Sequence, residues 1–199
     1  RAPWRSPHAS AEAHDGEFVD APESSSILGA AKVSGKLPSG LTIGLLDAVT
    51  AEERAEIASE SDARRKETVE PMTNFLAGRL QQEIDEGQTA FGAMLTAVNR
   101  NLDAPSVEFL ARSAYTGGVD FRHLWRDRTY YVEGGLEASP LRGNSDALLR
   151  VQTSSAHYFQ RPDANHVSLD STRTTLSGHA GSVRVGKGGH RLENQVELC

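Results

Sequence analysis

The sequence predicts an all-β fold, an antiparallel up-and-down meander of long strands that forms part of an outer-membrane-type β-barrel. Three observations carry this prediction. Apolar and polar residues alternate with a period of two, the period of a strand, over most of the chain after residue 26. The parity of the alternation flips across tight turns, as antiparallel pairing requires. Tight turns also alternate along the chain with longer connections, as in outer-membrane barrels.

The hairpin between Tyr115 and Ser139 has the clearest pattern. Its odd-numbered positions are mostly apolar before a turn at Asp127 and Arg128, and its even-numbered positions are apolar after that turn. Directly opposed residues of an antiparallel pair share a face, so the flip also predicts the register. The predicted opposed pairs are Trp125 with Tyr130, Phe121 with Gly134, and Arg122 with Glu133.

Two earlier hairpins follow the same rule. The first begins at Ser26 and turns at residues 38–40, and the second follows Pro71 and turns at residues 85–88. Residues 51–70, which lie between these hairpins, are the most charged part of the chain. We expect them to form a long polar loop that can include a helical turn.

The later segments bring the total to roughly nine strands. We expect a loop near residues 101–108, an alternating strand over 147–160, and a last pair over 172–187 and 190–198. The connection over 161–171 is long where the alternation of turn lengths requires a short one.

The chain divides into two parts. Residues 1–25 are rich in Pro, Ala, Ser and acidic residues and have no sustained period, so we expect an irregular lead-in or linker. Residues 26–199 are expected to form a partial barrel, a meander of hairpins incomplete at its C-terminal end. No initiator methionine or apolar signal segment is found at the start, and the chain is therefore expected to be a fragment of a longer protein.

Composition and motifs narrow the function classes. The net charge is −6 and no basic block stands out, which argues against nucleic acid as a partner. The single cysteine, Cys199, cannot form an internal disulfide or a cysteine metal cluster. The sequence contains no run of about 18 apolar residues, so it predicts no transmembrane helix. Without HExxH, GxSxG or GxGxxG motifs, and with no metal-ligand spacing among the histidines, we predict no enzymatic activity, no metal and no cofactor.

The predicted strands have one polar and one apolar face. The polar positions expected to face a barrel lumen are Lys32, Lys36, Arg79, Glu83, Asp120, Arg122, Glu133 and Glu137. The apolar positions expected to face outward are Val33, Ile43, Leu80, Phe91, Leu95, Val119, Phe121, Val132 and Leu136. Aromatic residues cluster where the strands of the central hairpin meet their turn, as interfacial aromatics do in membrane barrels: Trp125, Tyr130 and Tyr131. On a soluble sheet the same cluster would be a cross-strand aromatic contact.

Four long runs of the sequence, in the same order, resemble the β-barrel region of the DUF5916 family. They are ILGAAKVSGKLPSGLTIGLLDAVT (27–50), GRLQQEIDEGQTAFGAMLTAVNRNLD (78–103), AYTGGVDFRHLWRDRTYYVEGGLEAS (114–139) and YFQRPDANHVSLDSTRTTLSGHAGSVRVGKGG (158–189). The resemblance implies a large bacterial protein with a secretion signal, a sandwich domain like carbohydrate-binding-module family 9, and a long outer-membrane barrel region. It assigns no catalytic or binding residue.

The resemblance and the pattern together lead to one main expectation, a segment of an outer-membrane β-barrel that serves as a pore or anchor for glycan or polymer binding or uptake. Its partners would then be the lipid of the bacterial outer membrane and a glycan or other polymer. Two alternatives stay open: a soluble all-β module that binds carbohydrate or lipid, and a non-catalytic part of a larger hydrolase.

Overall fold

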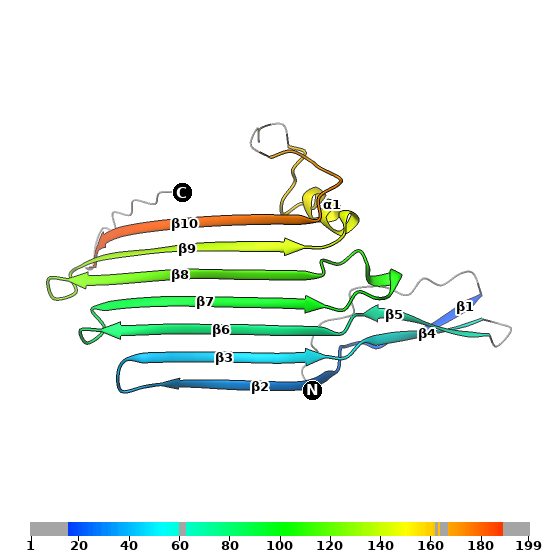
Figure 1. Ribbon diagram of the computed structural model, residues 1–199, viewed down its shortest axis with the longest axis horizontal. Helices are drawn as coiled ribbons and strands as arrows, with labels where there is room; N and C mark the ends of the chain where they lie inside the picture. The colour runs from blue at the N-terminus through cyan, green and yellow to red at the C-terminus, as the bar shows by residue number, and fades with distance from the viewer. Residues whose placement is uncertain (1–15, 60–62, 162, 164–166, 189–199) are drawn as a thin grey trace.

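A computed structural model describes residues 16–59, 63–161, 163 and 167–188, and it contains two antiparallel sheets (Figure 1). The larger sheet has seven strands in the order β10-β9-β8-β7-β6-β3-β2, and the smaller has three in the order β1-β4-β5. The strands of the larger sheet are β2 (Ile27–Lys36), β3 (Leu41–Thr50), β6 (Thr73–Ile84), β7 (Thr89–Arg100), β8 (Ser113–Trp125), β9 (Tyr130–Arg142) and β10 (Thr175–Lys187). The strands of the smaller sheet are β1 (Glu17–Asp20), β4 (Glu53–Ser59) and β5 (Arg64–Glu70).

The predicted all-β, antiparallel meander is confirmed, and so is the register of the central hairpin. In β8 and β9, Trp125 opposes Tyr130, and the other two predicted pairs are also in place. The hairpins β2–β3 and β6–β7 form around residues 38–40 and 85–88, as predicted. The four-residue turns 85–88 and 126–129 have the same backbone form, because the first three residues of each have positive φ. The predicted strand over 172–187 is β10, whereas the one over 190–198 lies outside the described residues.

The predicted strand over residues 147–160 is wrong, because this segment begins with helix α1 (Ser145–Thr153). Asn144 caps the helix, with its side-chain oxygen accepting a hydrogen bond from the amide of Ala147 at 2.8 Å. The buried residues of the helix, Ala147, Leu148 and Gln152, follow helical spacing. Since 147–160 is not a strand, the chain between β9 and β10 is a single long connection, and the apparent break at 161–171 disappears.

The connections now alternate regularly. Three tight turns lie at one end of the seven-stranded sheet, on the left in Figure 1, and three longer connections lie at the other end. The connection between β7 and β8 carries a short 3-10 helix, η1 (Pro105–Val107). We call the two ends of this sheet the tight-turn end and the long-connection end.

The polar loop predicted over residues 51–70 is also wrong, because this segment forms the hairpin β4–β5. Its high charge conceals an alternation in which Ala55, Ile57 and Val69 are buried and the charged residues lie on the other side. The lead-in predicted to be irregular over residues 1–25 supplies strand β1, which pairs with β4. Residues 1–15 of that lead-in lie outside the described part of the chain.

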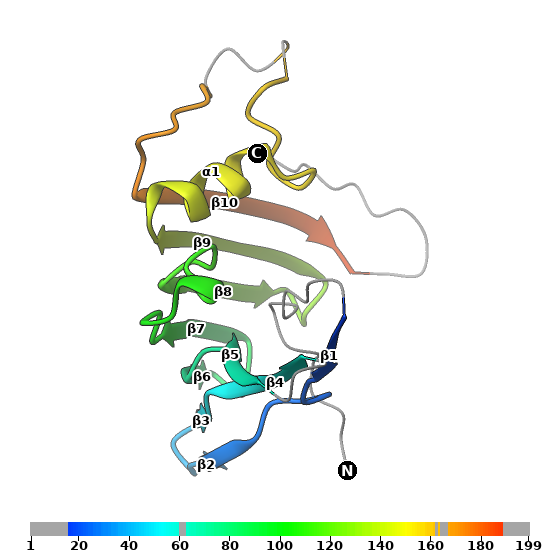
Figure 2. The same cartoon turned by 90° about the vertical axis from the view of Figure 1, so that its right-hand side faces the viewer.

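Most of the buried residues gather at the long-connection end. One cluster there joins the smaller sheet to the connection around η1, where the Ser106 hydroxyl donates to the carbonyl of Thr68 at 2.6 Å. A second surrounds Leu148 of α1, which is fully buried. By contrast, many large apolar residues of the seven-stranded sheet are exposed, and none of the described helices or strands covers the middle of the sheet in the view along its strands (Figure 2). None of the helices in the described residues is long and apolar enough to cross a membrane.

Candidate functional site: the two faces of the seven-stranded sheet

The strand registers sort the predicted face residues into two sets. All eight positions predicted to face a lumen lie on one face of the seven-stranded sheet, and all nine predicted outward positions lie on the other. We call these the polar face and the apolar face. Register alone settles this sorting, since opposed residues share a face across each of the paired strands.

The apolar face is large and accessible. Val33 is 63% exposed, Val119 58% and Leu136 68%, although all three lie within long, regularly paired strands. Water-soluble monomers rarely expose a continuous apolar surface of more than a few hundred Å². A surface that spans seven strands therefore requires a covering partner or an apolar solvent.

The polar face carries a row of alternating charges across the sheet. Register places Glu83, Ala90, Arg122, Glu133 and Arg184 side by side on five successive strands. Glu133 Oε1 accepts from Arg184 Nη1 at 2.8 Å, and Glu83 Oε2 lies 2.5 Å from Lys36 Nζ. Lys36 and Glu83 meet diagonally across β3, so the row extends from β2 to β10. It alternates cation and anion except on β3 and at Ala90 of β7, which contribute no charge.

A second ion pair on this face crosses a strand in the same way. Arg79 of β6 and Asp120 of β8 form two hydrogen bonds above β7, one of them 2.9 Å between Arg79 Nη2 and Asp120 Oδ1. Gly92 of β7 lies directly beneath. A Cβ at that position would lie 2.6 Å from both carboxylate oxygens of Asp120 and closer still to Arg79 Nη2. The glycine is therefore what lets the two charges meet.

Two shallow depressions lie beside the Arg79–Asp120 pair, with volumes of about 460 Å³ and 350 Å³. Their floors contain small residues, including Gly118, Gly135 and Ser182. Both are open, and neither has the shape of an enclosed catalytic pocket.

The aromatic residues at the tight-turn end divide between the faces. On the apolar face, Trp125 stacks between His123 and Tyr130, with ring centroids 5.9 Å apart in each pair. His123 Nδ1 also lies 2.9 Å from the Thr89 hydroxyl. Tyr131, which the sequence analysis grouped with Trp125 and Tyr130, projects from the polar face and covers Gly186.

Two cations approach the ring of Tyr130 on the apolar face. The Arg126 guanidinium carbon lies 6.0 Å from the ring centroid and Lys187 Nζ lies 5.7 Å from it. Sequence analysis missed both residues, together with Arg184 and Gly92. The alternation of residues 172–187 would have placed Arg184 on the polar face, opposite Glu133 of the preceding strand.

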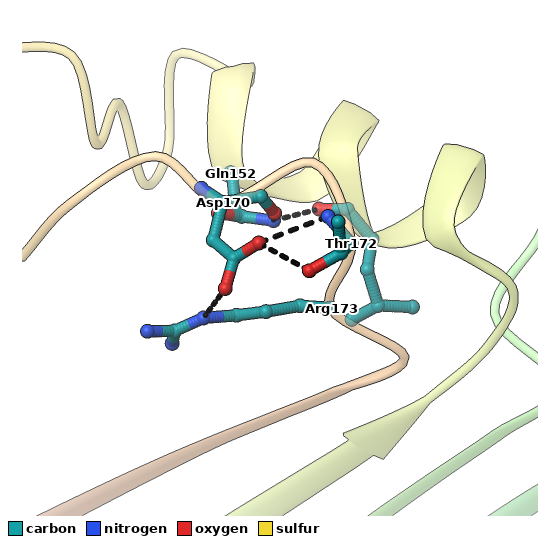
Figure 3. A network of polar contacts seen from close by, with 5 residues as sticks. Gln152, Asp170, Thr172 and Arg173 are labelled. Carbon is teal, nitrogen blue, oxygen red and sulfur yellow. Dashed lines mark hydrogen bonds and ion pairs between the residues drawn. The ribbon is translucent and has the colours of Figure 1, made fainter.

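A polar network outside the sheet holds the long connection between β9 and β10 against α1 (Figure 3). The side chain of Gln152, which is fully buried, bonds in both directions to the backbone of Asp170. Its Nε2 donates to the Asp170 carbonyl, its Oε1 accepts from the Asp170 amide, and both distances are 2.9 Å. One side-chain amide thereby satisfies both backbone groups of a residue 18 positions away.

Asp170 in turn orders the residues that follow it. Its Oδ1 accepts from the hydroxyl and the amide of Thr172 at 2.7 Å and 2.9 Å, and its Oδ2 lies 3.4 Å from Arg173 Nε. The hydrogen bonds from Thr172, followed by the hydrogen bond and the charge of Arg173, hold the pKa of the Asp170 carboxyl below its ordinary value. In the small sheet, the hydrogen bond from Lys66 likewise lowers the pKa of Glu56.

The metal-ligating side chains of the described residues do not come together as a site. No three His, Cys, Asp or Glu side chains gather as a metal site in the part of the chain that the structure describes. His157 lies 3.4 Å from the Ser154 hydroxyl on the surface, His179 lies in β10, and His166 is outside the described residues.

These features define the class of the protein: an antiparallel β-sheet protein whose main sheet has one apolar and one charged face, with its buried clusters confined to one end. The chain belongs to the family described as domain of unknown function (DUF5916), which it matches over residues 1–169. The resemblance seen in the sequence is thereby confirmed. Comparison with curated proteins and with solved structures gave no match.

Proposed function

We propose that the seven-stranded sheet is a membrane-spanning segment of a bacterial outer-membrane β-barrel. Its apolar face contacts lipid and its polar face lines the lumen. The observation that carries the proposal is the exposed apolar face, which runs across all seven strands opposite a face that bears paired charges. A barrel wall needs this division, because strands there alternate between lipid and lumen.

The dimensions of the apolar face agree with the proposal. Along β8, the apolar face runs from Tyr115 to Trp125, which is about 34 Å at about 3.4 Å per residue. With the usual barrel tilt of about 35–45°, this length spans about 24–28 Å of bilayer, against an apolar band of about 25 Å in known barrels. Tyr115 and Trp125 would then lie at opposite interfaces, where aromatic residues gather.

The distribution of connections also supports it. Outer-membrane barrels have short turns on the periplasmic side and longer loops outside the cell. The tight-turn end would thus face the periplasm. The long-connection end, with the small sheet, η1 and α1, would form the external surface.

The barrel would act as a pore or anchor rather than as an enzyme, and its ligand would be a glycan or another polar polymer. Ion pairs such as Arg79–Asp120 and Arg184–Glu133 offer donors and acceptors together without a large net charge. Such a surface suits a hydroxyl-rich chain better than a strongly charged one.

The test uses the full-length gene product. Cell envelopes are fractionated, the outer membrane is extracted with detergent, and boiled and unboiled samples are compared on a gel. A closed barrel should remain in the outer membrane and change its mobility on boiling. A product that is found in the soluble fraction and shows no mobility change would refute the proposal and favour the soluble binding module.

A further inference from the structure

The cluster at the tight-turn end of the apolar face combines aromatic rings with cations. His123, Trp125 and Tyr130 form a continuous stack across β8 and β9, with interplanar angles of 12° and 20°. Arg126 and Lys187 reach the same Tyr130 ring from the turn after β8 and from the end of β10. The three rings thus form one stack, and both charges lie beside Tyr130 at its end.

No carboxylate of the described residues neutralises either cation. Among the described residues, neither Arg126 nor Lys187 takes part in an ion pair, and Asp127, next in sequence to Arg126, pairs with neither. Arg128, in the same turn, is engaged differently, because its Nη2 donates to the carbonyl of Glu86 at 2.7 Å. Arg126 and Lys187 therefore hold positive charge beside a single ring, with N–H donors that no carboxylate of residues 16–59, 63–161, 163 or 167–188 engages.

We propose that Arg126 and Lys187 bind the phosphate of an anionic phospholipid in the periplasmic leaflet, with the stack of His123, Trp125 and Tyr130 against the upper part of its acyl chains. This inference rests on the proposed barrel, which places the tight-turn end at that leaflet. Aromatic rings are favoured at the headgroup level, and Arg and Lys near a membrane surface are attracted to anionic lipid. Cation–π contact with Tyr130 holds both charges in place before the lipid arrives.

The experiment measures lipid binding to the purified full-length protein in detergent micelles. Short-chain phosphatidylglycerol and phosphatidylcholine with identical acyl chains are titrated separately, and bound lipid is counted by native mass spectrometry. We expect tighter binding of phosphatidylglycerol. Each cation near an anionic lipid surface raises the binding constant about fivefold, so the double substitution Arg126→Gln with Lys187→Gln should weaken phosphatidylglycerol binding about 25-fold. Phosphatidylcholine binding should weaken much less, because its choline cation offsets the charge of its phosphate.

The matched control, Arg64→Gln with Lys66→Gln, removes the same charge from β5 at the other end of the molecule and should leave the preference intact. Inorganic phosphate provides a further arm. If it competes at the same concentration as phosphatidylglycerol, the site binds free anion and the lipid assignment is wrong.

Folding of every variant is verified by its mobility shift on boiling. An unchanged lipid preference in the Arg126 and Lys187 variant would overturn the inference while leaving the barrel intact. If the unsubstituted protein shows no mobility change on boiling, the barrel itself is refuted instead.

Discussion

Charging the centre of the apolar face gives the sharpest test of what that face contacts. Val119 lies four residues from Tyr115 and six from Trp125, which is about 14 Å and 20 Å along the strand. It therefore lies close to the middle of the proposed membrane span. Its opposed neighbours are Ala93 and Leu136, and neither can pair with an introduced charge.

The expected effect of Val119→Arg depends strongly on the surroundings. In a bilayer, an arginine on the lipid face near the midplane costs about 2–4 kcal/mol, which is about a 30- to 700-fold loss in the folding equilibrium. In water, Val119 is 58% exposed, and a surface substitution would change stability by about 0.5 kcal/mol or less. The two environments thus differ by more than the error of an unfolding experiment.

Urea unfolding of the full-length protein in lipid vesicles supplies the measurement, with the folded fraction read from unboiled gels. Thr116→Arg is the control, because it puts the same side chain on the polar face of the same strand, three residues closer to Tyr115. We expect Thr116→Arg to cost less than 1 kcal/mol if that face is hydrated. Equal costs for the two substitutions would refute the assignment of the faces.

Three further predictions concern local contacts. Gly92→Val should destabilise the folded protein by about 1–3 kcal/mol in the same unfolding assay, because the valine side chain would collide with the Arg79–Asp120 ion pair. The control Gly44→Val should cost less stability, since a Cβ at Gly44 meets nothing within 4 Å. Gln152→Leu should leave both backbone groups of Asp170 without their partner and cost about 1–3 kcal/mol of local stability, which limited proteolysis of the connection between β9 and β10 would detect as faster cleavage. The folded pKa of Asp170 lies below its ordinary 3.8, so its ionised form stabilises this connection above pH 3.8, and the stabilisation is lost as pH falls through the folded pKa. An NMR titration of the Asp170 carboxyl should show this lowered pKa, and Thr172→Val should raise the pKa toward its ordinary value.

The sequence predicted the hairpins well, because their two faces differ in polarity along their whole length. Trp125 and Tyr130 could be paired from parity alone, and so could Arg122 and Glu133. The same parity sorted every predicted face residue correctly relative to the others. It could not say what each face contacts, since lipid, water and a second sheet all permit the same alternation.

The missed elements had weaker or misleading patterns. In β4 and β5 the buried positions number only a few, such as Ala55 and Ile57, among many charged neighbours. In α1, the alternation of Leu149 and Val151 with polar residues resembles the pattern of a strand. The helix instead buries the polar Gln152, together with Ala147 and Leu148. Local polarity is a poor guide where burial of a side chain depends on a hydrogen bond formed with a distant segment.

The contact between Arg79 and Asp120 could not be predicted from pairs of strands. It spans three strands, and it requires the order β6-β7-β8 together with a glycine at the middle position. Each residue alone has an ordinary strand pattern. Only the assembled sheet brings the two charges above Gly92, so features of this kind need the strand order before the residues can be interpreted.

The strand count of the seven-stranded sheet limits how a barrel could be completed. Six successive antiparallel pairings leave the two edge strands, β2 and β10, pointing the same way, as Figure 1 shows. A fully antiparallel barrel therefore needs an odd number of further strands between them. Both edges also present cations on the polar face, Lys32 and Lys36 on β2 and Arg184 on β10. Strands that continue the alternating row of charges would place carboxylates beside these edges, because like charges directly opposed across a sheet are destabilising.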